Sequence, residues 1–305
     1  MGNSVHRLAL AASAFLACQV ACLSVPTSPA RSTARGSAAA GAATLTGAKR
    51  ETTPQIVHGA ESGAIDVQEA APHVARAVDV GNGVVLEVLD WGGQGPPVIL
   101  LAGLGNSAHI FDDLASVLVD GWRVLGVTRR GFGASSVTEA GYDIPSLGAD
   151  ILRALDALDV RQAVFVGHSI AGEELTWLGS EHADRVLGLV YLDAAYDRVA
   201  LREHRPPPSP EPAADPADLA SPLGYAAYMS RGMGMPLPLD EVRATFSFGP
   251  DGRFVGSATN PRVIRQIAGA VCVPDYSRLK APTLALYALA DHWTCSRTSG
   301  AASCP

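Results

Sequence analysis

A serine flanked by small residues is the part of this sequence best suited to chemistry. Ser169 follows an apolar run that ends at Gly167, and Ala171 and Gly172 come after it. A buried strand that turns sharply into a helix needs such small neighbours, and the strain of the turn lifts the serine hydroxyl clear of the sheet. A hydroxyl presented in this way can attack a carbonyl carbon, so the pattern predicts a nucleophile for acyl transfer.

A serine that caps an ordinary strand-to-helix turn is the other interpretation of Ser169. The nucleophile motif is usually written G-x-S-x-G, and Ala171 takes the place of its second glycine. Alanine is small enough for the turn. An apolar strand pattern before the serine and a helical pattern after it favour the nucleophile.

A glycine-rich segment, Leu100–Asn106, follows an earlier apolar run and suits the stabilisation of negative charge. Attack on a carbonyl carbon places negative charge on its oxygen, and two preorganised backbone N–H groups can stabilise that charge. We expect one N–H from Ile170, directly after the serine, and the other from Leu104 in this segment. A plain glycine turn is the alternative for the segment taken alone.

The elements that must position these groups alternate along the chain. Alternating apolar residues on both sides of Gly81–Gly83 predict a β-hairpin. Strands alternating with helices then predict an α/β fold, in which a mostly parallel sheet carries helices on both faces. The predicted strands cover 97–101, 122–127, 163–166, 186–192 and 283–288, and the predicted helices cover 110–119, 144–158 and 173–180.

The alternation stops between about residues 196 and 280, where we expect a cap inserted between two strands. Residues 205–222 are rich in Pro, Ala and Asp and predict a loop. Residues 223–277 carry short helical patterns and no clear strand pattern.

A third segment, Thr128–Ser135, completes a resemblance to a known family. With the other two it resembles the α/β-hydrolase superfamily, in the esterase, peptidase and haloperoxidase-like group, over roughly residues 73–291. That group commonly shows H-G-x, D-x-R-G-x-G-x-S and G-H-S-x-G segments. Ala102 replaces the usual His and Thr128 the usual Asp, and these departures predict altered packing of the loops.

The resemblance implies a catalytic triad in the chain order Ser, Asp, His. Asp291 lies in a segment similar to the family's P-x-L-x-x-x-G-x-x-D pattern. It would orient the histidine and stabilise the imidazolium. Asp193, after the strand at 186–192, is the second candidate, ranked lower because the family's aspartate there is often structural. A serine nucleophile in place of an aspartate disfavours a dehalogenase or an epoxide hydrolase.

No histidine follows Asp291 at the family's spacing. His292 adjoins Asp291, and adjacent side chains on an extended stretch point apart. His204, in the insertion, could serve only by an unusual route, and His109 lies near the glycine-rich segment, where it could touch substrate. We therefore expect little or no esterase activity unless a substitute base exists, for which His204 and His292 are the candidates. The other histidines of the domain are interpreted as structural or surface residues: His73, His168 and His182.

The tail after Asp291 has the pattern of neither a strand nor a helix. We expect a truncated or frame-shifted C-terminus with the family's last strand missing. The strand at 283–288 would then lie at the edge of the sheet, and the chain would tend to aggregate. A frame shifted near codons 288–295 should encode a longer tail that contains a histidine.

The N-terminal segment predicts export. His6 and Arg7 precede an apolar run, Leu8–Leu23, that is too short for a stable membrane span. We expect residues 1–30 to be a signal peptide, 31–72 a low-complexity linker and 73–305 the hydrolase domain. The destination would be the periplasm or the outside of the cell. A lipoprotein attached through Cys18 and a buried N-terminal helix are the alternatives.

Composition excludes several functions. The 305 residues carry a net charge of -7 and 6% aromatic residues, which argues against binding to nucleic acid. The five cysteines form no C-x-x-C pair and no H-E-x-x-H is present, so spacing predicts no metal site. No organic cofactor is implied.

These observations together predict an exported serine hydrolase. It would act on a small-molecule carboxylic ester or amide through an acyl-enzyme. A catalytically dead truncated hydrolase and an exported binding protein on the same fold are the alternatives. The sequence specifies neither the substrate nor the oligomeric state.

Overall fold

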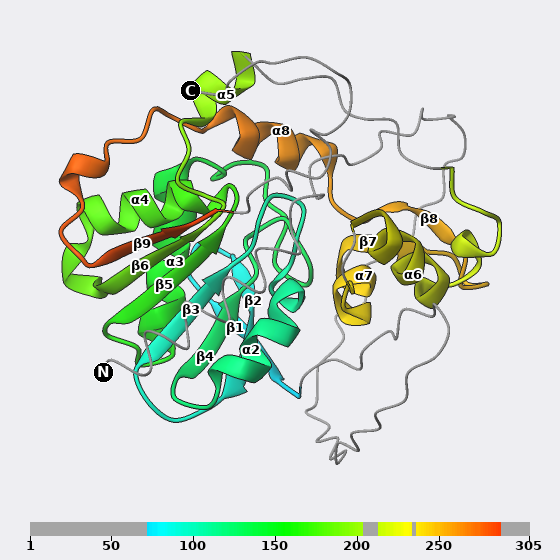
Figure 1. Cartoon of the computed structure of the whole chain (residues 1–305), viewed down its shortest axis with the longest axis horizontal. Coiled ribbons are helices and arrows are strands. Elements are labelled where there is room, and N and C mark those ends of the chain that lie inside the picture. The colour runs from blue at the N-terminus through cyan, green and yellow to red at the C-terminus, as the bar shows by residue number, and fades with distance from the viewer. Residues whose placement is uncertain (1–71, 204–212, 234–235, 288–305) are drawn as a thin grey trace, which may run out of the picture.

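A seven-stranded sheet forms the centre of the molecule (Figure 1). The computed structural model describes residues 72–203, 213–233 and 236–287. The strand order is β1-β2-β4-β3-β5-β6-β9, and every pair from β4 to β9 is parallel. The strands are β1 (Val74–Asp79), β2 (Val85–Gly92), β3 (Pro97–Leu101), β4 (Arg123–Val127), β5 (Ala163–His168), β6 (Val186–Leu192) and β9 (Thr283–Leu286). The expected mostly parallel sheet is confirmed.

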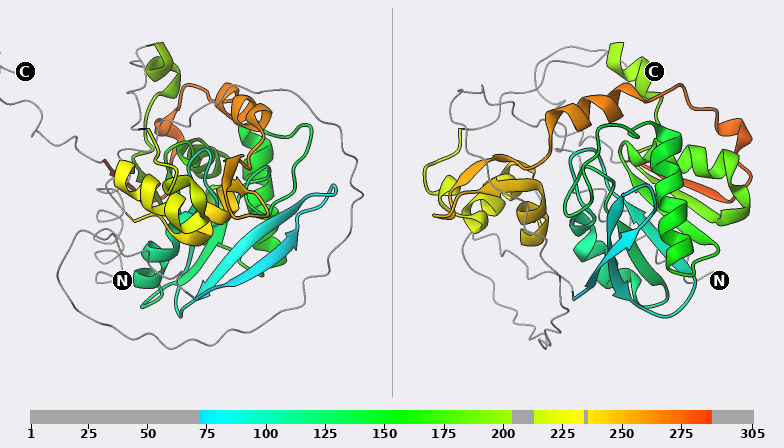
Figure 2. Two further views of the ribbon diagram at one scale, coloured as in Figure 1. Left: turned by 90° about the vertical axis from the view of Figure 1, so that its right-hand side faces the viewer. Right: turned by 180° about the vertical axis from the view of Figure 1, so that it is seen from behind.

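The hairpin at the start of the sheet is also as predicted. β1 pairs antiparallel with β2, and β2 pairs antiparallel with β4. Gly81 and Gly83 have φ values of 82° and 72°, a backbone region open to glycine at little cost. Figure 2 shows the two strands, in cyan, as a long ribbon on one side of the molecule.

Helices cover both faces of the sheet because its central strands are apolar on both sides. Along β3, Val98 and Leu100 join one core cluster, whereas Ile99 and Leu101 join another, as the two-residue period of a strand requires. The first cluster includes α2 (Asp112–Leu118), which follows the short helix η1 (Ala108–Phe111). The second includes α3 (Ile144–Ala157) and α4 (Ala171–Glu181).

The insertion lies between β6 and β9, beside the sheet (Figure 1). The expectation that it contains no strand is wrong, because β7 and β8 form an antiparallel pair. Runs of three and four residues are too short to show a strand period. The ring of Phe254 stacks on Tyr225 with centroids 4.1 Å apart and so supports the pair from α6. The elements are α5 (Arg198–Glu203), η3 (Asp218–Ala220), α6 (Pro222–Met233), α7 (Leu239–Thr245), β7 (Phe246–Phe248), β8 (Phe254–Ser257), α8 (Pro261–Gly269) and η4 (Tyr276–Arg278), with η2 (Ala183–Arg185) before β6.

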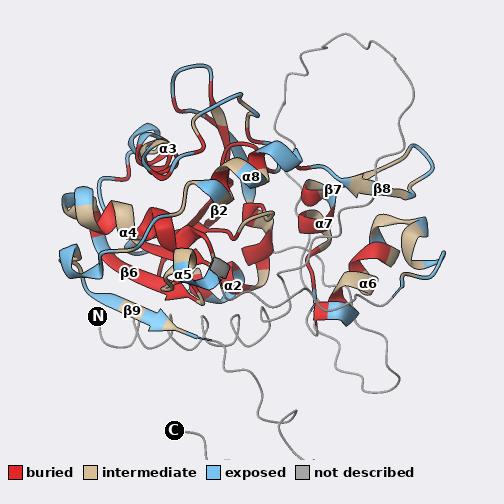
Figure 3. Cartoon of the chain, turned by 90° about the horizontal axis from the view of Figure 1, so that it is seen from above, coloured by how far each residue is buried: buried red, intermediate tan, exposed pale blue. Residues whose placement is uncertain are grey.

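β9 is the outermost strand on its side of the sheet within the described ranges. Its residues alternate between exposed and half-buried, and Figure 3 shows it paler than the buried central strands. The predicted edge position therefore holds for the part of the chain that is described. The expected signal peptide, the linker and the tail from residue 288 lie outside the described residues.

Within the described ranges, no helix combines the length and the apolar character that crossing a bilayer requires.

Candidate active site

Ser169 sits in a strained turn between the end of β5 and the start of α4. Its φ is +51°, in the left-handed region that residues with a Cβ seldom adopt. The backbone N–H of Ser169 donates to the carbonyl of Leu192 on β6 at 3.0 Å, which anchors the turn to the neighbouring strand. The conformation predicted for the serine is confirmed.

The glycine that this turn requires most strictly is Gly172. A Cβ added there would lie 2.2 Å from the carbonyl oxygen of Ala194, which follows β6. A Cβ on Gly167 would lie 2.6 Å from a methyl of Leu175. Ala171 is fully buried with its methyl in place. The alanine in the motif is therefore accommodated, and the close approach to β6 is made one residue later.

The two residues expected to supply oxyanion N–H groups pack against the same apolar cluster. Ile170 is a buried member of this cluster, and the half-buried Leu104 packs against it. Neither amide donates to another backbone carbonyl in the turns and loops of the described ranges. Both N–H groups are therefore available beside the serine turn.

A buried glutamate from the insertion holds the loop that carries Leu104. Glu241, on α7, is 1% exposed. Its carboxylate accepts hydrogen bonds from the Asn106 amide at 2.9 Å, the Ser107 hydroxyl at 2.5 Å and the Ser107 backbone N–H at 3.2 Å. Thr245 donates to it from the same helix at 2.9 Å. This contact ties the insertion to the loop after β3, and no sequence motif pointed to it.

The departure at Thr128 has a structural counterpart on β2. The Thr128 hydroxyl donates to the carboxylate of Glu87 at 2.7 Å and accepts from the backbone N–H of Ala108 at 3.0 Å. Both Thr128 and Glu87 are buried. Glu87 thus supplies a carboxylate next to the position where the family pattern has an aspartate.

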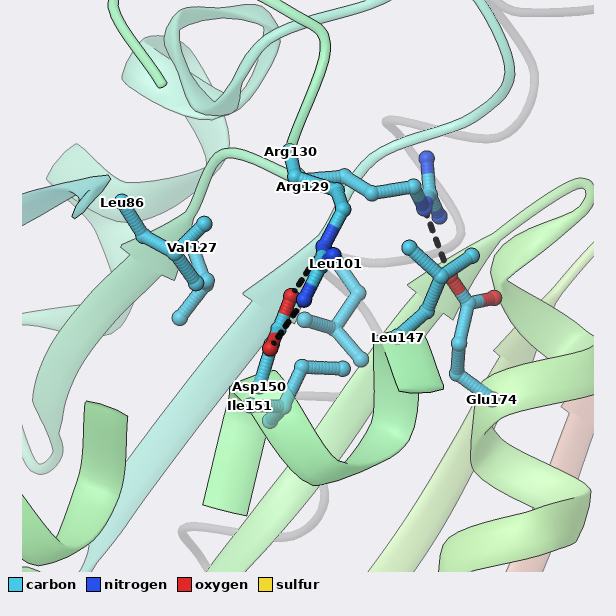
Figure 4. A pocket seen from close by; sticks show the side chains of 9 residues that line it. All are labelled: Leu86, Leu101, Val127, Arg129, Arg130, Leu147, Asp150, Ile151 and Glu174. Carbon is cyan, nitrogen blue, oxygen red and sulfur yellow. Dashed lines mark hydrogen bonds and ion pairs between the residues drawn. The ribbon is translucent and has the colours of Figure 1, made fainter. Parts of the chain in front are cut away.

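Two arginine pairs brace the segment after β4, and Figure 4 shows both. Arg130 binds Asp150 of α3 through two contacts of 2.6 Å. Arg129 donates to Glu174 of α4 at 2.6 Å. The cavity between these pairs measures about 10 Å³, which is room for a single water at most. It is a structural void and not a substrate site.

Of the two candidate acids, only Asp193 lies in the described ranges. It follows β6 with a φ of +48°, and its backbone N–H donates to the carbonyl of Leu286 on β9 at 2.8 Å. Its carboxylate accepts a hydrogen bond from the Tyr196 hydroxyl. Asp291 lies outside the described residues.

The described histidines have distinct surroundings. The ring of His168 packs against Gly103, where an added Cβ would meet it at 3.0 Å. Burial, helped by the charge of Arg198, lowers the pKa of His168 to about 4, so this ring is neutral at neutral pH. His182 ends α4 and contacts the Trp177 ring, with centroids 4.5 Å apart. His204 and His292 lie outside the described residues.

An acidic group one helical turn after the serine was not anticipated from the sequence. Glu173 is buried on α4, and burial raises its pKa to about 7, although the charge of Arg198 opposes the rise. The Arg198 Nε lies 3.6 Å from the Glu173 carboxylate. This pair places two ionisable groups beside the start of the insertion.

Comparisons with known proteins agree with this geometry. A family model described as the alpha/beta hydrolase fold matches residues 96–232. Epoxide hydrolase A of Mycobacterium tuberculosis is 39% identical over 139 residues, which are 44% of this chain and 41% of that protein. A non-heme chloroperoxidase of Kitasatospora aureofaciens is 34% identical over 115 residues, which are 37% of this chain and 42% of that protein.

A solved structure extends the likeness across most of the chain. The crystal structure of E-2-(acetamidomethylene)succinate hydrolase aligns with a TM-score of 0.56 at 20% identity. The alignment covers 70% of this chain and 80% of that one. At this identity the likeness concerns the fold. The chain spans about two fifths of the length of the two sequence relatives described above.

Proposed function

The chain belongs to the α/β-hydrolase superfamily, and from this premise we propose that it is a serine hydrolase that cleaves a carboxylic ester or amide of a small molecule. Ser169 attacks the carbonyl carbon and releases the alcohol or amine. Water then hydrolyses the acyl-enzyme and regenerates the serine. The N–H groups of Ile170 and Leu104 stabilise the oxyanion in both steps.

The left-handed turn at Ser169 carries this proposal. A serine that merely capped α4 would have an extended backbone and would accept from an N–H two or three residues later. Ser169 instead has a φ of +51°, and Gly172 donates to its backbone carbonyl at 3.0 Å. A strained turn of this kind costs about 1–3 kcal/mol, which favours a role for the hydroxyl that it presents.

The proposal assigns the acid to Asp291 or Asp193 and the base to His204 or His292. With the histidine at an atypical position, ester turnover should be weak. Loss of the triad histidine lowers kcat by about 10⁶ in a well-studied serine protease.

Export to the periplasm or the outside of the cell is a second part of the proposal. It rests on the apolar run Leu8–Leu23 behind Arg7 and on the low-complexity stretch that follows. N-terminal sequencing of protein recovered from an exporting host tests it. A start near residue 30 is expected, and an intact Met1 on most molecules would count against export.

Ester turnover by the full chain tests the proposed chemistry. We expect p-nitrophenyl acetate hydrolysis slightly above the buffer rate, abolished in Ser169→Ala and reduced in one of His204→Ala and His292→Ala. Equal rates for the wild type and Ser169→Ala would contradict the proposal and favour a binding protein on the same fold.

A further inference from the structure

A second cluster of ionisable side chains lies apart from the serine turn. His73 precedes β1, His109 belongs to η1, and Asp112 begins α2. One ligand-type atom from each of the three lies within 4.8 Å of the other two. Asp112 is fully buried, and the side chains of both histidines are 12% exposed. Three separate segments therefore converge on one small volume.

Two buried atoms in this cluster face each other without a hydrogen bond. The Nδ1 of His109 and the Oδ2 of Asp112 are 3.8 Å apart, too far for a hydrogen bond. Neither atom has any hydrogen-bond partner within the described ranges. Buried polar atoms are nearly always satisfied, because an unsatisfied one is costly to desolvate. A cation between these two atoms would satisfy both.

The spacing fits a metal ion with nitrogen and oxygen ligands. Ligands about 2.0–2.1 Å from a tetrahedral Zn²⁺ lie about 3.3 Å from one another. The Nδ1 of His73 lies 3.4 Å from the Oδ1 of Asp112. The pair formed by His109 and Asp112, at 3.8 Å, has to close by a few tenths of an ångström.

The groups around the cluster are those that orient metal ligands. A metal-bound histidine usually directs its other ring nitrogen to a carboxylate, and the Nε2 of His109 lies 3.7 Å from Glu87. The Trp91 indole donates to the Oδ1 of Asp112 at 2.8 Å and fixes that carboxylate. With both imidazoles neutral, the two carboxylates give the cluster a charge of about -2, which attracts a cation.

We propose that His73, His109 and Asp112 bind a divalent first-row transition-metal ion, for which Zn²⁺ is the best match, and that Glu87 orients His109. Two imidazoles and one carboxylate leave a further coordination position for water. None of the ligands belongs to the serine turn or to the Leu104 loop. The ion therefore ties the start of β1 to α2 and stabilises this edge of the fold.

Zn²⁺ binding to the full chain tests the site. After treatment with a chelator, calorimetric titration should show a site for one Zn²⁺ per chain, and Zn²⁺ should raise Tm. His73→Gln and Asp112→Asn should weaken this binding at least tenfold, and Glu87→Gln by about 10–100-fold. His182→Gln, which removes a histidine elsewhere, is the matched control and should bind as the wild type does.

Two further readouts keep the test decisive. His73→Gln changes a residue ahead of the first strand, so it gives the answer even if Asp112→Asn fails to fold. Co²⁺ bound at this site should show visible d–d bands without the charge-transfer band of a thiolate, which separates the site from cysteines such as the exposed Cys272. Absence of binding, equal affinity in His73→Gln and His182→Gln, or a thiolate band would overturn the proposal.

Discussion

The carboxylate of Glu241 in the insertion accepts hydrogen bonds from both the backbone N–H and the hydroxyl of Ser107, in the loop after β3. These two residues are 134 positions apart in the chain. The contact means that the insertion sets the conformation of the loop that presents the Leu104 N–H. A change at Glu241 should therefore affect both the stability of the fold and the reactivity of Ser169.

Glu241→Ala should lower the free energy of unfolding by about 2–4 kcal/mol, because it leaves several buried donors without an acceptor. It should also slow ester turnover by about tenfold or more, since a misplaced oxyanion donor raises the barrier. Urea denaturation and kcat measurements check both effects. Asp240→Asn, on the same helix but more exposed, is the control and should change stability by no more than about 0.5 kcal/mol. Equal behaviour of the two variants would contradict the coupling.

Ser169→Gly should be more stable than Ser169→Ala by about 0.5–1 kcal/mol. Both variants lose the hydroxyl, but only glycine relieves the left-handed φ of +51°. Chemical denaturation of the two variants side by side measures the difference. If the alanine variant is the more stable, the turn is not strained as described.

Asp150→Ala should destabilise the fold by about 3–5 kcal/mol, because it leaves the buried Arg130 without its partner. Arg153→Ala supplies the matched control. Arg153 contacts the same carboxylate at 3.4 Å, but its side chain is 48% exposed, so its loss should cost less than about 1 kcal/mol. Thermal melts of both variants check the prediction, and similar shifts in Tm would argue against the buried pair as the main brace.

Glu173 predicts a specific dependence of stability on pH. Burial raises its pKa from 4.5 to about 7, so the folded state holds a proton that the unfolded state releases between about pH 4.5 and 7. The contribution of Glu173 to the free energy of unfolding should therefore be present at low pH, fall across this window and stay flat above it.

Glu173→Gln should remove that slope. Glu181→Gln, at the exposed end of the same helix, should keep the wild-type slope. Urea midpoints measured from pH 5 to pH 8 compare the three proteins. Parallel curves for the wild type and Glu173→Gln would show that Glu173 does not hold the proton.

Local pattern was sufficient to predict the serine turn and the parallel sheet. The strain at Ser169 follows from small residues within a few positions of it, and each central strand is a continuous apolar run. The β7 and β8 pair was missed because its strands are too short to show alternation. Its support comes from Tyr225, which lies in another element.

Contacts between distant segments could not be predicted in this way. Glu241 has the composition and spacing of an ordinary surface residue on a short helix, and only the fold buries it against Ser107. The same applies to His73, which reaches Asp112 only because the first strand ends beside α2. No short motif joins them, so spacing predicted no metal site where the structure brings three ligand types together.

The most direct test of the central claim is covalent labelling of the full chain with a fluorophosphonate, followed by peptide mass spectrometry. A fluorophosphonate reports a serine whose hydroxyl is activated and whose oxyanion is stabilised. The account predicts a single adduct on Ser169, none in Ser169→Ala, and slower labelling of Glu241→Ala than of Asp240→Asn. No adduct on the folded wild-type protein, or an adduct on another residue, would contradict it.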